Sequence, residues 1–115
     1  MKVNIEKKDG VVVFHVSGSL DAENVQQFKS QAVKIIEGGL FRFVLDFSNL
    51  EFVDSMGLGA MISLLRRVRP KKGDIKIASV NKDVMSIFEI RRLHRLFEIY
   101  PNTEHAANSF LRDGQ

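Results

Sequence analysis

The sequence predicts a single α/β domain over residues 1–115, with a mostly parallel sheet, an antiparallel edge strand from an N-terminal hairpin, and about four helices. Predicted strands alternate with predicted helices along the chain, which favours parallel pairing through right-handed crossovers. The 115 residues, 44% of them hydrophobic, are enough for one core of ordinary size. These observations do not determine the strand order.

The N-terminal segment has the pattern of a β-hairpin. Val3 and Ile5 alternate with polar residues, and the apolar run from Val11 to Val16 begins directly after Asp9-Gly10. An Asp-Gly pair between two such runs favours a tight turn between antiparallel strands. We therefore expect the first strand to run antiparallel to the second.

A helix, a strand and a second helix are predicted next. Apolar residues at helical spacing between residues 23 and 37, followed by Gly38-Gly39, predict an amphipathic helix. The short apolar run from Phe43 to Phe47 is typical of a central parallel strand. From Met56 to Val68 apolar residues occupy almost every helical face, so we expect a largely buried helix that ends before Pro70.

The same alternation continues to the C-terminus. Residues 75–80 and 96–100 are predicted strands, and residues 82–92 form a predicted helix behind an Asn81 cap. A last helix is expected behind Thr103.

Composition excludes several classes of function. No apolar run approaches the roughly 18 residues of a membrane span, and a signal-peptide core is absent, so we expect a cytoplasmic protein that does not act at a membrane. With no cysteine and three scattered histidines, neither metal nor cofactor is expected. The formal charge of +3 comes largely from two basic clusters. Basic residues at helix C-termini are expected from the helix dipole, so direct DNA binding is not predicted.

Two expected loops, 17–24 and 48–59, follow the ends of parallel strands, where partner and ligand sites gather in such sheets. In the second, Asp54 and Ser55 precede the buried helix, so Ser55 should lie at or beside its N-cap. Either side chain could simply accept hydrogen bonds from the free amides. Gly57 and Gly59, however, each cost about 1 kcal/mol relative to alanine inside a helix, which favours close approach by a docking partner or a phosphate.

Three segments carry a resemblance to a known family: Gly18-Ser19-Leu20-Asp21-Ala22, Val44-Leu45-Asp46-Phe47-Ser48 and Asp54-Ser55-Met56-Gly57-Leu58-Gly59. They are similar to the corresponding motifs of STAS domains, within which the chain resembles the anti-sigma factor antagonists of the sporulation and stress-response type. The resemblance covers nearly the whole chain. Met56 departs from the small residue that is common beside the family's phosphorylated serine, and Arg92-Leu93-His94 replaces a frequent Gly-Leu-Asp.

The resemblance implies a switch. Ser55 would be phosphorylated by a partner anti-sigma factor with a histidine-kinase-like ATP fold, and a PP2C-type phosphatase would restore the hydroxyl. The unphosphorylated form would bind the anti-sigma factor and release its sigma factor. The residues expected to contact the partner are Asp21, Asp54, Ser55, Met56, Gly57, Leu58 and Gly59. We expect Met56 to be exposed, because the family has a small polar residue there.

Three alternatives remain open. Ser55 could be a nucleophile in a motif close to Gly-x-Ser-x-Gly, although no histidine is obviously placed as its base. Asp46 could be the phosphoacceptor of a receiver domain, but the acid pair and the lysine that such domains need are missing. A STAS module could also act as a scaffold, or bind lipid or nucleotide, without a phosphorylation cycle. His15 is in register with Val11 and Val13, so we interpret it as structural.

Overall fold

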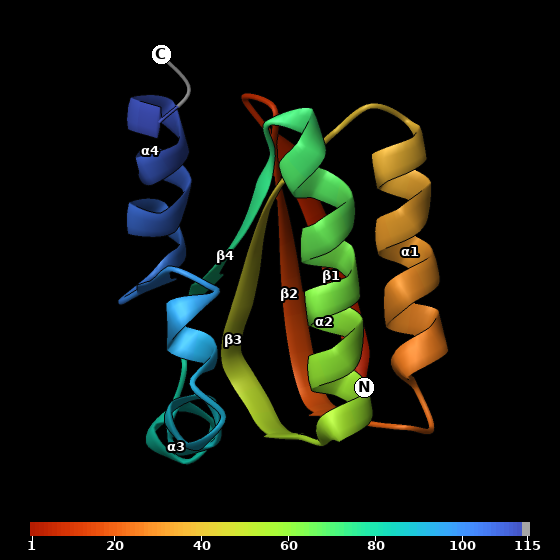
Figure 1. The fold of residues 1–115 in the computed structure, drawn as a ribbon, viewed down its shortest axis with the longest axis vertical. Coiled ribbons are helices and arrows are strands. Elements are labelled where there is room, and N and C mark those ends of the chain that lie inside the picture. The colour runs from red at the N-terminus through yellow and green to blue at the C-terminus, as the bar shows by residue number, and fades with distance from the viewer. Residues whose placement is uncertain (114–115) are drawn as a thin grey trace.

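The computed structural model describes residues 1–113, which form one five-stranded sheet in the order β1-β2-β3-β4-β5 (Figure 1). The strands are β1 Lys2–Lys8, β2 Val11–Leu20, β3 Arg42–Val53, β4 Asp74–Ala78 and β5 Ile99–Tyr100. β1 pairs antiparallel with β2, and the other pairs are parallel. The predicted α/β class, hairpin and antiparallel edge strand are confirmed. Residues 114 and 115 of the predicted domain lie outside the described residues.

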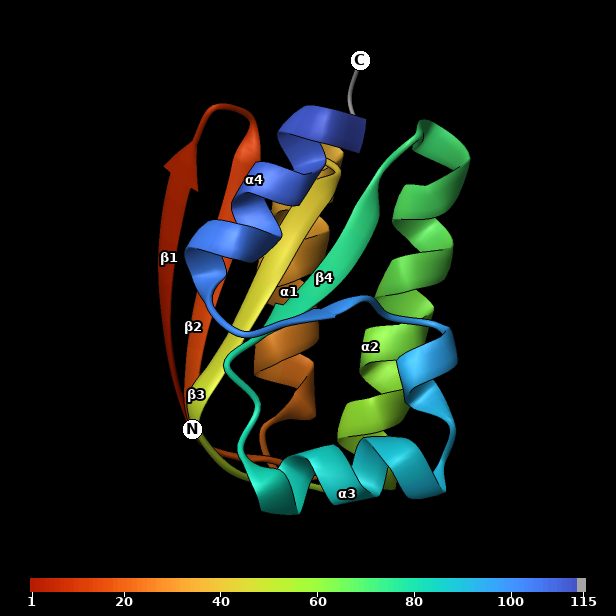
Figure 2. The same ribbon diagram turned by 90° about the vertical axis from the view of Figure 1, so that its left-hand side faces the viewer.

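The helices lie on both faces of the sheet and at one end of it. They are α1 Val25–Glu37, α2 Ser55–Val68, α3 Lys82–Ile90 and α4 Thr103–Asp113, with short 3-10 helices η1 Arg69–Lys71 and η2 Leu93–Arg95. α1 and α2 lie side by side on one face, and α4 lies on the other (Figure 1). α3 crosses the end of the sheet beside the N-terminus of α2 (Figure 2).

Alternate residues of the central strands supply two separate cores. The larger core, beneath α1 and α2, takes one set of alternate side chains: Val12, Phe14, Val16, Phe43, Leu45 and Phe47. The smaller core lies beneath α4 and consists of Val11, Val44, Ala78, Ala106 and Phe110. The period of two in β2 and β3 therefore divides these strands between the two faces.

β3 extends further than the predicted strand 43–47. Polar, exposed side chains at Ser48, Asn49 and Glu51 interrupt the apolar run, yet the backbone continues its parallel pairing with β2 as far as Val53. β2 likewise continues to Leu20. Half of the residues in the two expected loops therefore belong to strands, and residues 55–59 belong to α2. Only the segment 21–24 and residue 54 link the strands to helices.

The C-terminal elements also differ in their limits from the prediction. β4 ends at Ala78, because Ser79 adopts a φ of 63° that leaves the extended conformation. The predicted strand 96–100 is confined to Ile99–Tyr100 and follows η2. The Asn81 cap is confirmed, since its side chain accepts a hydrogen bond from the Val84 amide, although α3 ends at Ile90. Thr103 is the first residue of α4 rather than its cap.

Over residues 1–113 no helix combines the length and the apolar character needed to cross a membrane. Within the same range, no group of three or more histidine, cysteine or acidic residues is arranged to hold a metal ion.

Candidate functional site

The candidate site lies where β2 and β3 end and α2 begins. β2 ends at Leu20 and β3 at Val53, and the Asp54 amide donates to the Leu20 carbonyl at 3.2 Å. Only Asp54 separates β3 from α2. The abrupt transition from strand to helix fixes Ser55 at the first helical position, on the edge of the sheet where parallel strands terminate.

Asp54 is the N-cap of α2, which decides between the two capping residues left open by the sequence. One carboxylate oxygen accepts from the Gly57 amide at 2.9 Å, and the other accepts from the Ala22 amide at 3.0 Å. The hydrogen bond from Gly57 is the main reason why the pKa of the Asp54 carboxyl lies below its ordinary value, with a further contribution from Ala22. One ionised side chain thus caps the helix and holds the neighbouring 21–24 segment.

Asp21 belongs to the 21–24 segment, whose conformation is held by hydrogen bonds of the Asn24 side chain. The Asn24 side chain accepts from the Asp21 amide at 3.0 Å and donates to the Ser19 carbonyl at 2.7 Å. The Asp21 carboxylate accepts from the Glu23 amide at 3.1 Å and does not cap α1, whose N-cap position is Asn24. Asp21 is half-buried, and its segment is joined to the Ser55 corner through Ala22 and Asp54.

Ser55 and Met56 project from the first turn of α2. Ser55 is exposed, and its hydroxyl makes no hydrogen bond with any residue that the structure describes. Met56 is 55% exposed, so the expected exposure is confirmed. Capping by Asp54 leaves the Ser55 hydroxyl available for an external group.

The two glycines of α2 have different surroundings. A methyl group on Gly57 would lie 2.6 Å from the Leu20 carbonyl oxygen and 2.9 Å from Val53 Cγ2. The close approach that Gly57 permits is therefore to the chain's own β2, and attributing it to a partner or a phosphate was wrong. Gly59 is exposed, and a methyl group there would meet nothing within 4 Å.

The family model for the STAS domain matches residues 2–106. The chain belongs to the STAS domain family. Its five-stranded sheet with one antiparallel edge strand and its helices match the fold of a solved STAS domain protein.

Similar proteins include named regulators. The anti-sigma F factor antagonist of Paenibacillus polymyxa is 27% identical over 92% of this chain and 92% of its own. The anti-sigma-B factor antagonist of Staphylococcus aureus is 26% identical over 90% of this chain and 98% of its own. The phosphorylated form of the Bacillus cell fate determinant SpoIIAA superposes with a TM-score of 0.74, at 21% identity over 94% of this chain and 98% of that one. The last likeness concerns the fold alone.

In this STAS domain, the residues expected to contact the partner differ in their exposure to solvent. Ser55, Met56 and Gly59 are exposed, Asp21 and Asp54 are half-buried, and Gly57 and Leu58 are buried. The first five are accessible at the surface, whereas Gly57 and Leu58 pack beneath it.

A groove beside Ser55 adds residues that the sequence did not indicate. It has a volume of about 370 Å³ and is lined by Phe52, Val53, Asp54, Ser55, Leu58, Ile87, Ile90 and Arg91. Phe52 and Ile90 are 48% and 79% exposed. Phe52 falls in the expected loop 48–59 and Ile90 in the predicted helix 82–92, and nothing in either segment indicates a shared surface. Only the position of α3 against β3 and α2 reveals that these two residues line one groove.

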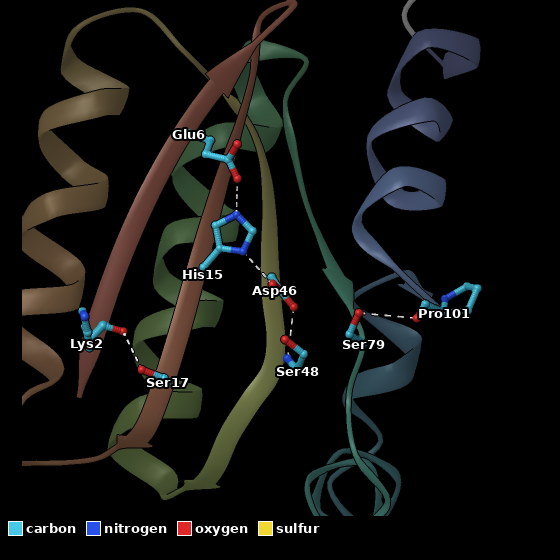
Figure 3. Close-up of polar contacts among 8 residues, drawn as sticks. All are labelled: Lys2, Glu6, His15, Ser17, Asp46, Ser48, Ser79 and Pro101. Atoms are coloured by element: carbon cyan, nitrogen blue, oxygen red, sulfur yellow. Dashed lines mark hydrogen bonds and ion pairs between the residues drawn. The ribbon is translucent and has the colours of Figure 1, made fainter.

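His15 lies on the opposite face of the sheet and forms a cluster with two carboxylates (Figure 3). Its Nδ1 is 2.6 Å from Asp46 Oδ2, and its Nε2 contacts Glu6 Oε1. Burial lowers the pKa of the imidazole, but hydrogen bonds to Asp46 and Glu6 outweigh it, so the pKa lies above its ordinary value. Because the cluster is held on the other face, His15 is not a base for Ser55.

Proposed function

We propose that this protein is an anti-sigma factor antagonist whose unphosphorylated form binds an anti-sigma factor and thereby releases a sigma factor. Phosphorylation of Ser55 switches the binding off. The anti-sigma factor, with a histidine-kinase-like ATP fold, transfers the γ-phosphoryl group of ATP to the Ser55 oxygen and yields ADP and a proton. A PP2C-type phosphatase hydrolyses the phosphoserine. The proposal is supported by the names of the similar proteins and by one observation: the Ser55 hydroxyl at the start of α2 is exposed and makes no hydrogen bond with a residue that the structure describes.

The geometry favours an effect on the interface over an effect on the fold. A phosphate on Ser55 adds about −1.5 to −2 charges at the positive end of the α2 dipole, where an anion is stabilised. Asp54 keeps the cap in both forms, because the Ser55 hydroxyl takes no part in it. The domain should therefore remain folded when Ser55 is phosphorylated.

The charge is large enough to switch binding. At an effective dielectric constant near 20, two like charges about 7 Å apart repel by roughly 2 kcal/mol. A phosphoserine that faces an acidic group or a bound nucleotide of the partner would experience more than one such repulsion. Since about 1.4 kcal/mol is a tenfold change in affinity, a loss of a hundredfold or more needs no conformational change.

The experiment combines phosphotransfer and binding with each anti-sigma factor encoded in the source genome. After incubation with the purified anti-sigma factor and ATP, intact-mass analysis should show one added phosphate, and peptide mapping should place it on Ser55. The Ser55→Ala variant should gain no phosphate and should bind normally. Ser55→Asp should bind at least tenfold more weakly, because a carboxylate carries part of the phosphate's charge.

A matched control shows whether the effect of Ser55→Asp depends on the position of the added charge or on the added charge alone. Ser30 is an exposed serine on α1, so Ser30→Asp adds the same charge away from the Ser55 corner. It should bind as the wild type does. Equal binding by Ser55→Ala and Ser55→Asp would contradict the electrostatic switch, and a phosphate mapped to another residue would contradict the site.

A further inference from the structure

The groove between α2 and α3 combines exposed apolar side chains with one cation. Phe52 and Ile90 present large apolar surfaces at its edge, and Met56 is exposed on the same turn of α2 as Ser55. Exposed apolar side chains that gather at one place mark a contact surface more often than scattered ones do. Arg91 follows Ile90 and lines the groove together with Ser55.

Arg91 is available for an external anion. Its side chain is exposed, and none of the ion pairs among residues 1–113 involves it. Asp54, the carboxylate in the groove lining, already accepts two backbone amides. Arg92 and Arg95 are also exposed, but they are not among the residues that line the groove. The groove is thus largely apolar with one cation, Arg91, that makes no ion pair with a described residue, which is complementary to an apolar segment that carries a carboxylate.

We propose that Arg91 is the point at which the phosphate signal is read. In the unphosphorylated protein the groove docks an apolar segment of the anti-sigma factor, and Arg91 pairs with a carboxylate of that segment. In the phosphorylated protein Arg91 pairs with the phosphate on Ser55 in the same groove. Phosphorylation therefore removes an attractive contact as well as adding a repulsive one. Both the docked partner and the phosphate on Ser55 rest on the proposed function, but the pairing of Arg91 with a phosphate can be tested without it, on phosphoserine introduced directly at position 55.

Arginine suits this role because its planar guanidinium can form two parallel hydrogen bonds with either a carboxylate or a phosphate. The choice between the two anions depends on proximity, because the phosphate is attached to the groove and the partner's carboxylate arrives from solution. A tethered anion has the advantage of a high effective concentration. One arginine can therefore distinguish the two states of Ser55 without any movement of the backbone.

The first test needs no partner. Phosphoserine is introduced at position 55 by genetic code expansion, and its second ionisation is followed by phosphorus NMR. An arginine at the phosphate favours the dianion, so Arg91→Gln should raise the pKa of the phosphoserine by about 0.2 to 0.7 units, as expected for an exposed ion pair. Arg91→Lys should recover part of the shift, and the control Arg95→Gln should leave the titration unchanged. Identical titration curves for the wild type and Arg91→Gln would overturn the pairing.

The second test measures docking with the anti-sigma factor and unphosphorylated variants. Ile90→Ala should weaken binding at least tenfold and Arg91→Gln about threefold to fivefold, the range of an exposed ion pair, whereas Arg95→Gln should change it less than twofold. The effect of Arg91→Gln should shrink as salt is added, because salt screens an exposed charge pair.

The outcomes distinguish this inference from the proposed function. If Ser55→Asp weakens binding but Arg91→Gln and Ile90→Ala do not, the groove is not the docking site, although the switch stands. If no anti-sigma factor binds, both the proposed function and the docking of an anti-sigma factor in the groove are wrong. The phosphorus titration still shows whether Arg91 pairs with the phosphate on Ser55. Sedimentation of the unphosphorylated chain provides a further check. A dimer that Ile90→Ala dissociates would show that a second copy occupies the groove and would overturn docking of the anti-sigma factor.

Discussion

The Ser55 corner and the Glu6–His15–Asp46 cluster lie on different parts of one sheet and differ in how their polar side chains are satisfied. In the cluster the imidazole contacts a carboxylate on either side, so its members are bound to one another (Figure 3). At the corner, Asp54 makes the internal hydrogen bonds and the Ser55 hydroxyl makes none with a described residue. We infer that substitutions in the cluster change stability, whereas substitutions at the exposed corner change binding.

Two methionines of α2 allow the same substitution to be compared at a buried and at an exposed position. Met61 is fully buried and Met56 is 55% exposed, so the same truncation samples core and surface. Met61→Ala should lower the free energy of unfolding by about 2 to 5 kcal/mol. Met56→Ala should change it by less than about 0.5 kcal/mol.

The same two methionine variants should differ in the rate at which the anti-sigma factor dissociates. Met56→Ala should speed dissociation of the anti-sigma factor, because it removes a flexible apolar contact beside Ser55. Met61→Ala, measured on its folded fraction, should leave the dissociation rate unchanged. Urea denaturation and binding kinetics on the same samples check both. A large loss of stability in Met56→Ala with an unaltered dissociation rate would remove Met56 from the contact surface.

A second pair, Gly57 and Gly59, tests the corner itself. In Gly57→Ala the new methyl group would lie 2.6 Å from the Leu20 carbonyl oxygen, so we expect a loss of about 1 to 3 kcal/mol from overpacking. Gly59→Ala has open space and should gain up to about 1 kcal/mol from helix propensity.

Binding distinguishes the two readings of Gly59. If a partner approaches the backbone there, Gly59→Ala should bind more weakly despite its higher denaturation midpoint. Unchanged binding would indicate that Gly59 does not contact the partner. A stable Gly57→Ala variant would contradict the packing of α2 against Leu20.

The sequence predicted most of the fold, because local patterns carried the information. The Asp9-Gly10 turn, the apolar run 43–47 and the Asn81 cap each identify an element within a few residues. The extension of β3 to Val53 could not be predicted, since its polar residues acquire strand structure only by pairing with β2.

The candidate site was predicted in part for the same reason. The position of Ser55 beside the cap and the exposure of Met56 followed from the motif and from the family pattern. Gly57 is needed because α2 packs against the Leu20 carbonyl of β2, and Phe52 and Ile90 come to line one groove only when α3 packs against β3. Contacts between segments far apart in the chain leave no local signal.

The smallest expected effect concerns pH and the cluster. The pKa of His15 is raised above its ordinary value of 6.5 in the folded protein, so the protonated imidazole favours folding. Its contribution is fully present below the unfolded pKa and is lost as pH rises through the higher folded pKa. His15→Gln should therefore lose more stability at pH 5.5 than at pH 8.5, by less than about 1 kcal/mol because the cluster is partly exposed. Urea denaturation of both proteins between these limits measures the difference, and anti-sigma factor binding should be the same for both, since the cluster lies on the face opposite α2. A deficit that grows as pH rises would contradict stabilisation by the protonated imidazole, and weakened binding at constant stability would show that the two regions are coupled.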